Sequence, residues 1–168
     1  SFKYLRQIDE QTQFEVLTYY TDSFRGSTIA SRNLDTLVSY PRNSHTFGIE
    51  PRLSRVFTLG PVTQEVGVGY RYLKEAMHEQ ASQLELVNNV RVGGPKGDGH
   101  AYQDRTGGTE ANAFYIDDKI DVGNWTVTPG IRFERISTQW HDRPVLDAKG
   151  KPVQEKKRSI DSNEALPA

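Results

Sequence analysis

Cysteine is absent from the 168-residue chain. Without thiols the chain cannot form disulfides, supply a thiolate nucleophile or bind a metal through sulfur. An excess of charge is also absent, because 21 Lys and Arg face 22 Asp and Glu, for a formal net charge of -1. No field of one sign would draw the chain onto a polyanion, so we expect no nucleic-acid partner.

Apolar residues are scarce as well. Hydrophobic residues make up 35% of the chain and the mean hydropathy is -0.68, which is low for a closed globule. No run of about 18 apolar residues occurs, and this excludes a membrane-spanning helix. Membrane-spanning strands are not excluded, because they alternate lipid-facing and lumen-facing residues and give only a weak hydropathy signal.

Alternation of apolar and polar residues is the feature that the chain does have. It predicts strands with one apolar and one polar face. The polar residues mix acids, bases, glycines and hydroxyls, which suits a water-filled lumen or an exposed sheet face. Pro51 and Pro129 lie inside such stretches and predict edges, bulges or ladder ends. The five predicted strands are 13–20, 47–59, 62–75, 110–121 and 125–136.

The connections between these strands differ in length. "GPV" at 60–62 and "DVGN" at 121–124 have the chemistry of tight hairpins. The segments 21–46, 76–109 and 141–163 are rich in Gly, Ser, Asn, Asp and charge, and they predict long loops. In up-and-down strands the short turns share one rim and the long loops the other, which is typical of outer-membrane barrels. We expect the loops, above all 81–108 and 141–163, to be the least ordered parts.

Two other classes of protein compete with a membrane barrel. In a soluble extracellular β-sandwich that binds a ligand, apolar side chains such as Phe114, Ile116, Ile131 and Phe133 would be buried against a second sheet. An enzyme needs a reactive constellation, and the sequence offers none. "HEQAS" at 78–82 begins like a zinc HExxH motif, but Ser82 stands where the second His is required. We therefore expect no catalytic residues.

Several motifs carry a family resemblance. "GIEPR", "EVGVGYRYL", "GTEANAFYIDDKIDVGNWT" and "TPGIRFE" closely resemble barrel strands of TonB-dependent outer-membrane receptors, and within that family the receptors for ferric citrate, iron(III) dicitrate. The resemblance covers most of the chain and weakens at 81–101 and 141–160. It implies an all-β fold of antiparallel up-and-down strands that form part of a large plugged transmembrane β-barrel with long extracellular loops, the 22-stranded type.

The resemblance also implies a setting for the chain. Residues 1–168 would be part of the barrel, and the plug domain would lie outside this chain. The protein would sit in the outer membrane of a Gram-negative bacterium, contact lipid and lipopolysaccharide, and take up ferric citrate or a similar anionic iron chelate with energy supplied through TonB. A receptor for another siderophore is the alternative within the family.

Ligand binding is expected to depend on arginine. Ferric citrate presents carboxylate oxygens, and the guanidinium fork of Arg matches a carboxylate. The resemblance implies a ligand-binding role for Arg25, Arg42 and Arg105, which we expect on the long-loop rim. Iron would be held through citrate, so no protein metal ligand and no cofactor is expected.

Overall fold

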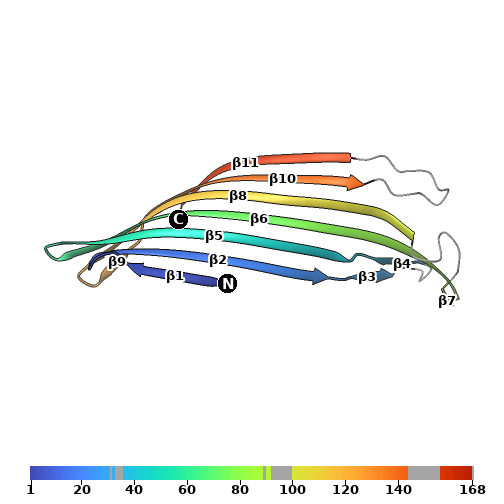
Figure 1. The fold of residues 1–168 in the computed structure, drawn as a ribbon, viewed down its shortest axis with the longest axis horizontal. Coiled ribbons are helices and arrows are strands. Elements are labelled where there is room, and N and C mark those ends of the chain that lie inside the picture. The colour runs from blue at the N-terminus through green and yellow to red at the C-terminus, as the bar shows by residue number, and fades with distance from the viewer. Residues whose placement is uncertain (31, 33–35, 89, 92–99, 144–155, 168) are drawn as a thin grey trace.

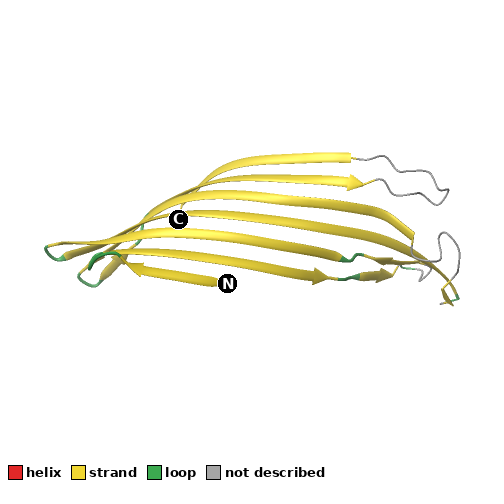
Figure 2. Cartoon of the chain, in the orientation of Figure 1, coloured by secondary structure: helices red, strands yellow, loops and turns green. Residues whose placement is uncertain are grey.

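The computed structural model describes residues 1–30, 32, 36–88, 90–91, 100–143 and 156–167. These residues contain no helix and therefore no helical membrane span (Figure 2). They form eleven strands. The strands are β1 (Phe2–Gln7), β2 (Thr12–Arg25), β3 (Thr28–Ala30), β4 (Thr36–Ser39), β5 (Arg42–Leu59), β6 (Val62–Val87), β7 (Val90–Arg91), β8 (His100–Val122), β9 (Trp125–Val127), β10 (Gly130–Arg143) and β11 (Lys156–Pro167).

All these strands belong to one antiparallel layer. The main path runs β1-β2-β5-β6-β8-β10-β11, so neighbours in the sheet follow their order in the chain (Figure 1). The short strands extend this path: β3 pairs with β4, β4 and β7 pair with β6, and β9 pairs with β8. The predicted all-β, up-and-down arrangement is confirmed, and the sheet remains open at β1 and β11.

Both predicted tight turns are present. Gly60 joins β5 to β6 with φ 61°, and Gly123 joins β8 to β9 with φ 57°. A side chain is strained in this left-handed region, which explains glycine at both positions. The turn between β1 and β2 lies at the same end of the sheet (Figure 1). Here the Asp9 side chain accepts a hydrogen bond of 2.8 Å from the Gln11 amide. The short turns thus share one rim.

Both prolines interrupt a ladder. The β5–β6 pairing runs from Ile49 to Arg52 without partners for the two residues between them, one of which is Pro51. Pro129 falls between β9 and β10, and its carbonyl accepts a 2.9 Å hydrogen bond from the Asp118 amide. The missing N–H of proline accounts for both interruptions.

The prediction of three long loops was wrong over much of its extent. Residues 21–25, 42–46, 76–87, 100–109, 141–143 and 156–163 lie in strands. Here the strands have continued past the apolar stretch and carry polar residues on both faces, so hydropathy no longer alternates. Their backbone groups are satisfied by the neighbouring strands, which needs no apolar face. Residues 92–99 and 144–155, where the prediction also applied, lie outside the described residues.

The apolar side chains of the central strands lie on one face of the sheet, which we call the apolar face. Phe114 and Phe133 are direct partners there, each 53% exposed, and Ile131 is 42% exposed. Among the described residues no large side chain is fully buried. A β-sandwich would cover these side chains with a second layer, and the strands that the structure describes include no such layer (Figure 1). The described residues therefore form a single open sheet with an uncovered apolar face.

The upper limit of the apolar face runs obliquely across the sheet. On each strand the uncharged residues of the apolar face end where the next residue on that face is charged. The last uncharged residue is Phe133 on β10, Tyr72 on β6 and Tyr20 on β2. Phe133 lies level with Tyr70, and Tyr20 lies level with Lys74. The limit therefore climbs along the strands from β10 to β2. Strands tilted by about 35–45° in a bilayer give this offset.

The other face, which we call the polar face, is neutralised by cross-strand ion pairs. Arg52 holds Asp117 through two hydrogen bonds of 2.9 and 3.0 Å. Arg71 Nε lies 3.0 Å from Glu50 Oε1. These pairs join neighbouring or next-but-one strands, which stabilises a wetted wall.

Candidate ligand-binding site

The three arginines singled out from the sequence belong to one row of residues across the sheet. Consecutive strand pairings connect the members directly, so all of them lie on the polar face. Strands are about 4.8 Å apart, and the row is thus about 20 Å long. We call it the charged row: Arg25 on β2, Arg42 on β5, Glu79 on β6, Arg105 on β8 and Asp142 on β10.

The structure corrects the location of the arginines. Arg25 is the last residue of β2, Arg42 is the first of β5, and Arg105 lies inside β8. None of them lies in a loop. Glu79 follows the last aromatic residue of the apolar face on β6, Tyr72, by seven residues, or about 23 Å along the strand. The charged row therefore lies beyond the apolar face, at the end of the sheet opposite the short turns.

Arg42 is engaged by Glu79. Arg42 Nε donates a 2.9 Å hydrogen bond to Glu79 Oε2, and Nη2 donates to the same oxygen. The other oxygen, Oε1, accepts a 3.2 Å hydrogen bond from Gln103 Nε2. Glu79 is only 8% exposed. Both oxygens of this buried carboxylate are thus satisfied, as burial of a charge requires.

Arg105 is held from two sides. Its Nε donates a 2.5 Å hydrogen bond to Asp142 Oδ1, and its guanidinium lies 5.7 Å from the centre of the Trp140 ring. The hydrogen bond to Asp142 is the main reason why the pKa of Arg105 is raised, and the lowering effect of partial burial is smaller. Arg105 therefore keeps its charge at any pH that the protein meets.

Trp140 owes its position to a glycine. Gly107 is its direct partner on β8, and a Cβ atom on Gly107 would stand 2.5 Å from Trp140 Cε3. The ring can lie against the backbone of β8 only because this side chain is missing. The contact with Arg105 therefore depends on Gly107.

Arg25 is the unbalanced member of the charged row. Its direct partner is Arg42, another cation. Within the part of the chain that the structure describes, the Arg25 side chain has no ion pair and no hydrogen bond. Like charges directly opposite each other destabilise a sheet. These five residues, three arginines and two carboxylates, have a surplus of one positive charge, and the two adjacent cations are Arg25 and Arg42. At the other end the row of strand partners continues to Lys156 on β11, the direct partner of Asp142.

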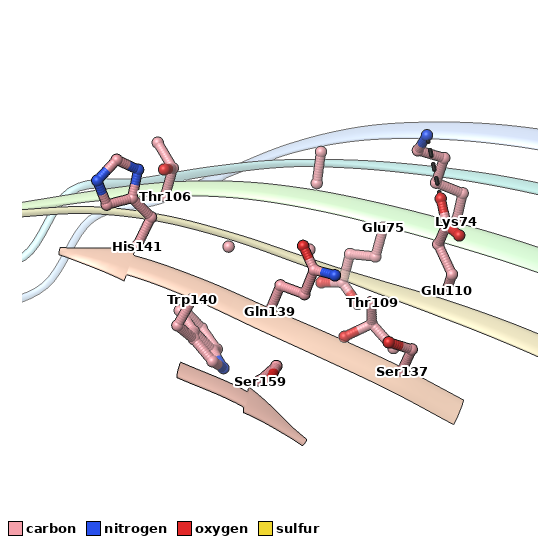
Figure 3. A pocket seen from close by; sticks show the side chains of 13 residues that line it. Lys74, Glu75, Thr106, Thr109, Glu110, Ser137, Gln139, Trp140, His141 and Ser159 are labelled. Carbon is pink, nitrogen blue, oxygen red and sulfur yellow. Dashed lines mark ion pairs between the residues drawn. The ribbon is translucent and has the colours of Figure 1, made fainter. Parts of the chain in front are cut away.

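A depression of about 730 Å³ lies beside the charged row, along β6, β8 and β10 (Figure 3). Its lining includes Trp140, His141, Thr109 and the ion pair between Lys74 and Glu110, whose atoms are 3.2 Å apart. Figure 3 shows His141 and Trp140 on opposite sides of β10. Because its lining comes from both faces of the sheet, we assign no ligand to this depression.

Metal ligands do not gather in the described residues. No group of three or more His, Asp or Glu side chains there could hold a metal ion. Two histidines instead pair with single carboxylates: His78 Nε2 lies 2.7 Å from Asp104 Oδ1, and His45 Nδ1 lies 3.3 Å from Asp22 Oδ1. Chelation of iron by citrate stays a prediction.

Sequence reasoning missed the partners of the arginines, namely Glu79, Trp140 and Asp142, and it missed Gln103, which donates to Glu79. Two of them could have been found. Counting outward from the tight turn at Gly60 along both strands of the hairpin places Arg42 opposite Glu79. The same count from the tight turn at Gly123 places Arg105 opposite Asp142. The pairing of β6 with β8 has no short turn from which to count, so the position of Arg105 in the same row was hidden.

Comparison with known proteins agrees with this architecture. The family model described as "TonB dependent receptor-like, beta-barrel" matches residues 1–167. The ferric citrate transporter FecA, in its unliganded form, is 37% identical in sequence, with a TM-score of 0.77 over 98% of this chain and 23% of that one.

Two further structures share the fold at low sequence identity. The siderophore receptor PiuA from Acinetobacter baumannii is 12% identical with a TM-score of 0.71, over 98% of this chain and 28% of that one. The open form of the ferric-catecholate import receptor Fiu from E. coli K12 is 12% identical with a TM-score of 0.67, over 97% and 31%. The chain spans less than a third of each of these proteins.

The family match covers almost the whole chain, and the open sheet has the apolar face and polar wall of a barrel segment. Members of the family are receptors and transporters, not enzymes, and they reside in the outer membrane of Gram-negative bacteria. The chain belongs to the TonB-dependent receptor family and forms part of its outer-membrane β-barrel.

Proposed function

We propose that this chain supplies part of the ligand-binding wall of a receptor that takes up ferric citrate, or a closely similar anionic iron chelate, with energy supplied through TonB. Arg25, Arg42 and Arg105 would contact the ligand, and iron would enter as the citrate complex. Contact with TonB would be made by parts of the protein outside this chain. The apolar face would meet lipid, and the outer rim would meet lipopolysaccharide.

One observation carries the proposal: Arg25 and Arg42 are direct partners, and Arg25 has no carboxylate partner among the described residues. Two adjacent guanidinium groups repel each other, and a ligand carboxylate between them would relieve this repulsion. Arg also forms paired hydrogen bonds with a carboxylate, which Lys does not. An anionic chelate that presents several carboxylates fits this surplus of charge.

The choice of citrate has separate support. The relative that is 37% identical is described as a ferric citrate transporter. PiuA and Fiu are described as receptors for a siderophore and for ferric catecholate, but at 12% identity their likeness concerns the fold. Catecholates lack carboxylates, so they would use the arginine pair less well. Another siderophore remains the alternative within the family.

Binding titrations on the purified full-length receptor test the proposal. Ferric citrate is expected to bind, and the double variant Arg25→Ala/Arg42→Ala should lose most of this binding. Arg143→Ala is the matched control: it removes one arginine at the same level, 3.9 Å from Asp104 rather than in the charged row. If a ferric catecholate binds and ferric citrate does not, the alternative siderophore receptor replaces the proposal.

A further inference from the structure

Glu79 stands apart from the other charged residues. Among the residues whose burial the structure describes, it is the only charged one that is buried. It lies in the charged row between Arg42 and Arg105, on the strand that separates them. The polar-face pair Arg52–Asp117 is more accessible, with side chains 36% and 19% exposed, against 11% for Glu79. A carboxylate has thus been placed, at some cost in desolvation, where an anionic ligand would bind.

The contacts of Glu79 occupy one edge of the Arg42 guanidinium. Nε and Nη2 form one edge of the guanidinium fork, and both donate to Glu79 Oε2. Gln103 fixes the carboxylate from the other side by donating to Oε1. The side chain of Glu79 therefore takes one of the two edges by which Arg42 could hold a carboxylate, and a ligand on the other edge would share the guanidinium with Glu79.

We infer that Glu79 is an internal competitor of the ligand: it holds Arg42 in place, and its charge limits how tightly an anion binds to the charged row. This inference rests on the proposed function. A ligand carboxylate must share Arg42 with Glu79 or displace it, and in both cases it approaches a fixed negative charge. Two negative charges that share one guanidinium repel each other strongly when they are shielded from water. Glu79 is therefore a specificity-determining residue that disfavours highly charged anions.

Glu79→Gln in the full-length receptor tests this directly. Gln has nearly the same shape and can still bond to Gln103, but it adds one positive charge to the net charge of the row. We expect about a tenfold gain in affinity for ferric citrate, as an effect of one pK unit between neighbouring charges implies. The affinity should also fall more steeply with salt. Glu110→Gln is the control, because it removes the same charge from the Lys74 pair, outside the charged row.

Iron-free citrate is the second probe, and it separates this inference from the proposed function. If the wild type fails to bind ferric citrate, but Glu79→Gln binds iron-free citrate more tightly than the wild type and Glu110→Gln do, the proposed function is wrong and the inference about Glu79 holds. If Glu79→Gln binds both probes no better than the wild type, the inference is overturned, whatever the wild type binds.

A second variant, which adds a negative charge instead of removing one, tests the inference if Glu79→Gln does not assemble into a folded receptor. Gln103→Glu places a second carboxylate beside Glu79 without removing any contact of Arg42, and it should weaken binding of either probe about tenfold. Unchanged or tighter binding in an assembled Gln103→Glu receptor would overturn the inference by itself.

Discussion

Arg25 and Arg42 are direct partners across the antiparallel strands β2 and β5. Such a pair of cations is unfavourable in a sheet unless an anion offsets it. The Arg42 side chain is paired with Glu79 on its other side. The Arg25 side chain has no ion pair and no hydrogen bond in the described part of the chain. The rim of the barrel wall thus has a local surplus of positive charge that the described residues do not neutralise.

Arg25→Ala should therefore reduce ligand binding without a cost in stability. A hydrogen bond between charged groups contributes about 1.5 to 3 kcal/mol, so affinity for ferric citrate should fall by about one to two powers of ten. Removing Arg25 also removes its repulsion with Arg42. The thermal unfolding temperature of the receptor should stay the same or rise slightly. A clear drop in unfolding temperature would mean that Arg25 has a structural partner after all.

Arg42→Ala is expected to affect both binding and folding. Ligand affinity should fall by about one to two powers of ten for the same reason as at Arg25. Since Arg42 belongs to a strand and satisfies Glu79, its removal also leaves a buried carboxylate with fewer partners, at about 1–3 kcal/mol. Arg42→Lys should recover part of the affinity, because the charge is kept and the fork is lost. Calorimetric titration and unfolding in detergent measure the two effects separately.

The central strands could be predicted because lipid imposes a pattern on them. Where a strand meets lipid on one side and water on the other, its residues alternate, as in 62–75, and this segment lies within β6. Beyond Tyr72 both faces are wet, and the remaining residues of β6 carry no such pattern. The outer half of β8 also lacks this pattern, so it was not predicted as a strand, and Arg105 within it was placed in a loop. β11 contains "RSIDSNEA", in which polar residues dominate both faces.

The arginines could be picked out from the sequence, but their arrangement could not. A sequence names Arg25, Arg42 and Arg105 as cations and says nothing about their neighbours across the sheet. Register depends on where each strand begins to pair, and one residue of slip would move an arginine to the other face. The hairpins at Gly60 and Gly123 fix the registers of β5 with β6 and of β8 with β10 locally, but no tight turn fixes β2 with β5 or β6 with β8. The role of the three arginines in ligand binding stays a prediction.

Trp140 should support ligand binding through Arg105. Its ring lies 5.7 Å from the Arg105 guanidinium, and an exposed cation–π contact of this kind is worth about 0.5–1 kcal/mol. Trp140→Ala should therefore weaken ferric citrate binding two- to fivefold, roughly the equivalent of that energy, while Trp140→Phe should retain most of it. Gly107→Ala should give a similar loss, because its Cβ would displace the ring. Full affinity for ferric citrate in both Trp140→Ala and Gly107→Ala would show that the Trp140 ring does not contribute to ligand binding.

The last prediction concerns the two faces of β10. Ile131 lies on the apolar face, 42% exposed beside Ile116, and it should meet lipid in the assembled barrel. Ile131→Arg is therefore expected to destabilise the folded receptor by about 2 to 4 kcal/mol if the site is near the bilayer midplane. Ile136 is five residues further along the same strand, and the alternation of side chains places it on the polar face.

Ile136→Arg makes the identical substitution on that wetted face and should cost much less. Folding titrations into lipid vesicles, followed by the heat-resistant migration of folded barrels in gels, measure both variants on one scale. A similar loss in the two variants would mean that the faces have been misassigned. A larger loss at Ile136 would mean that the face we call polar is the one that meets lipid.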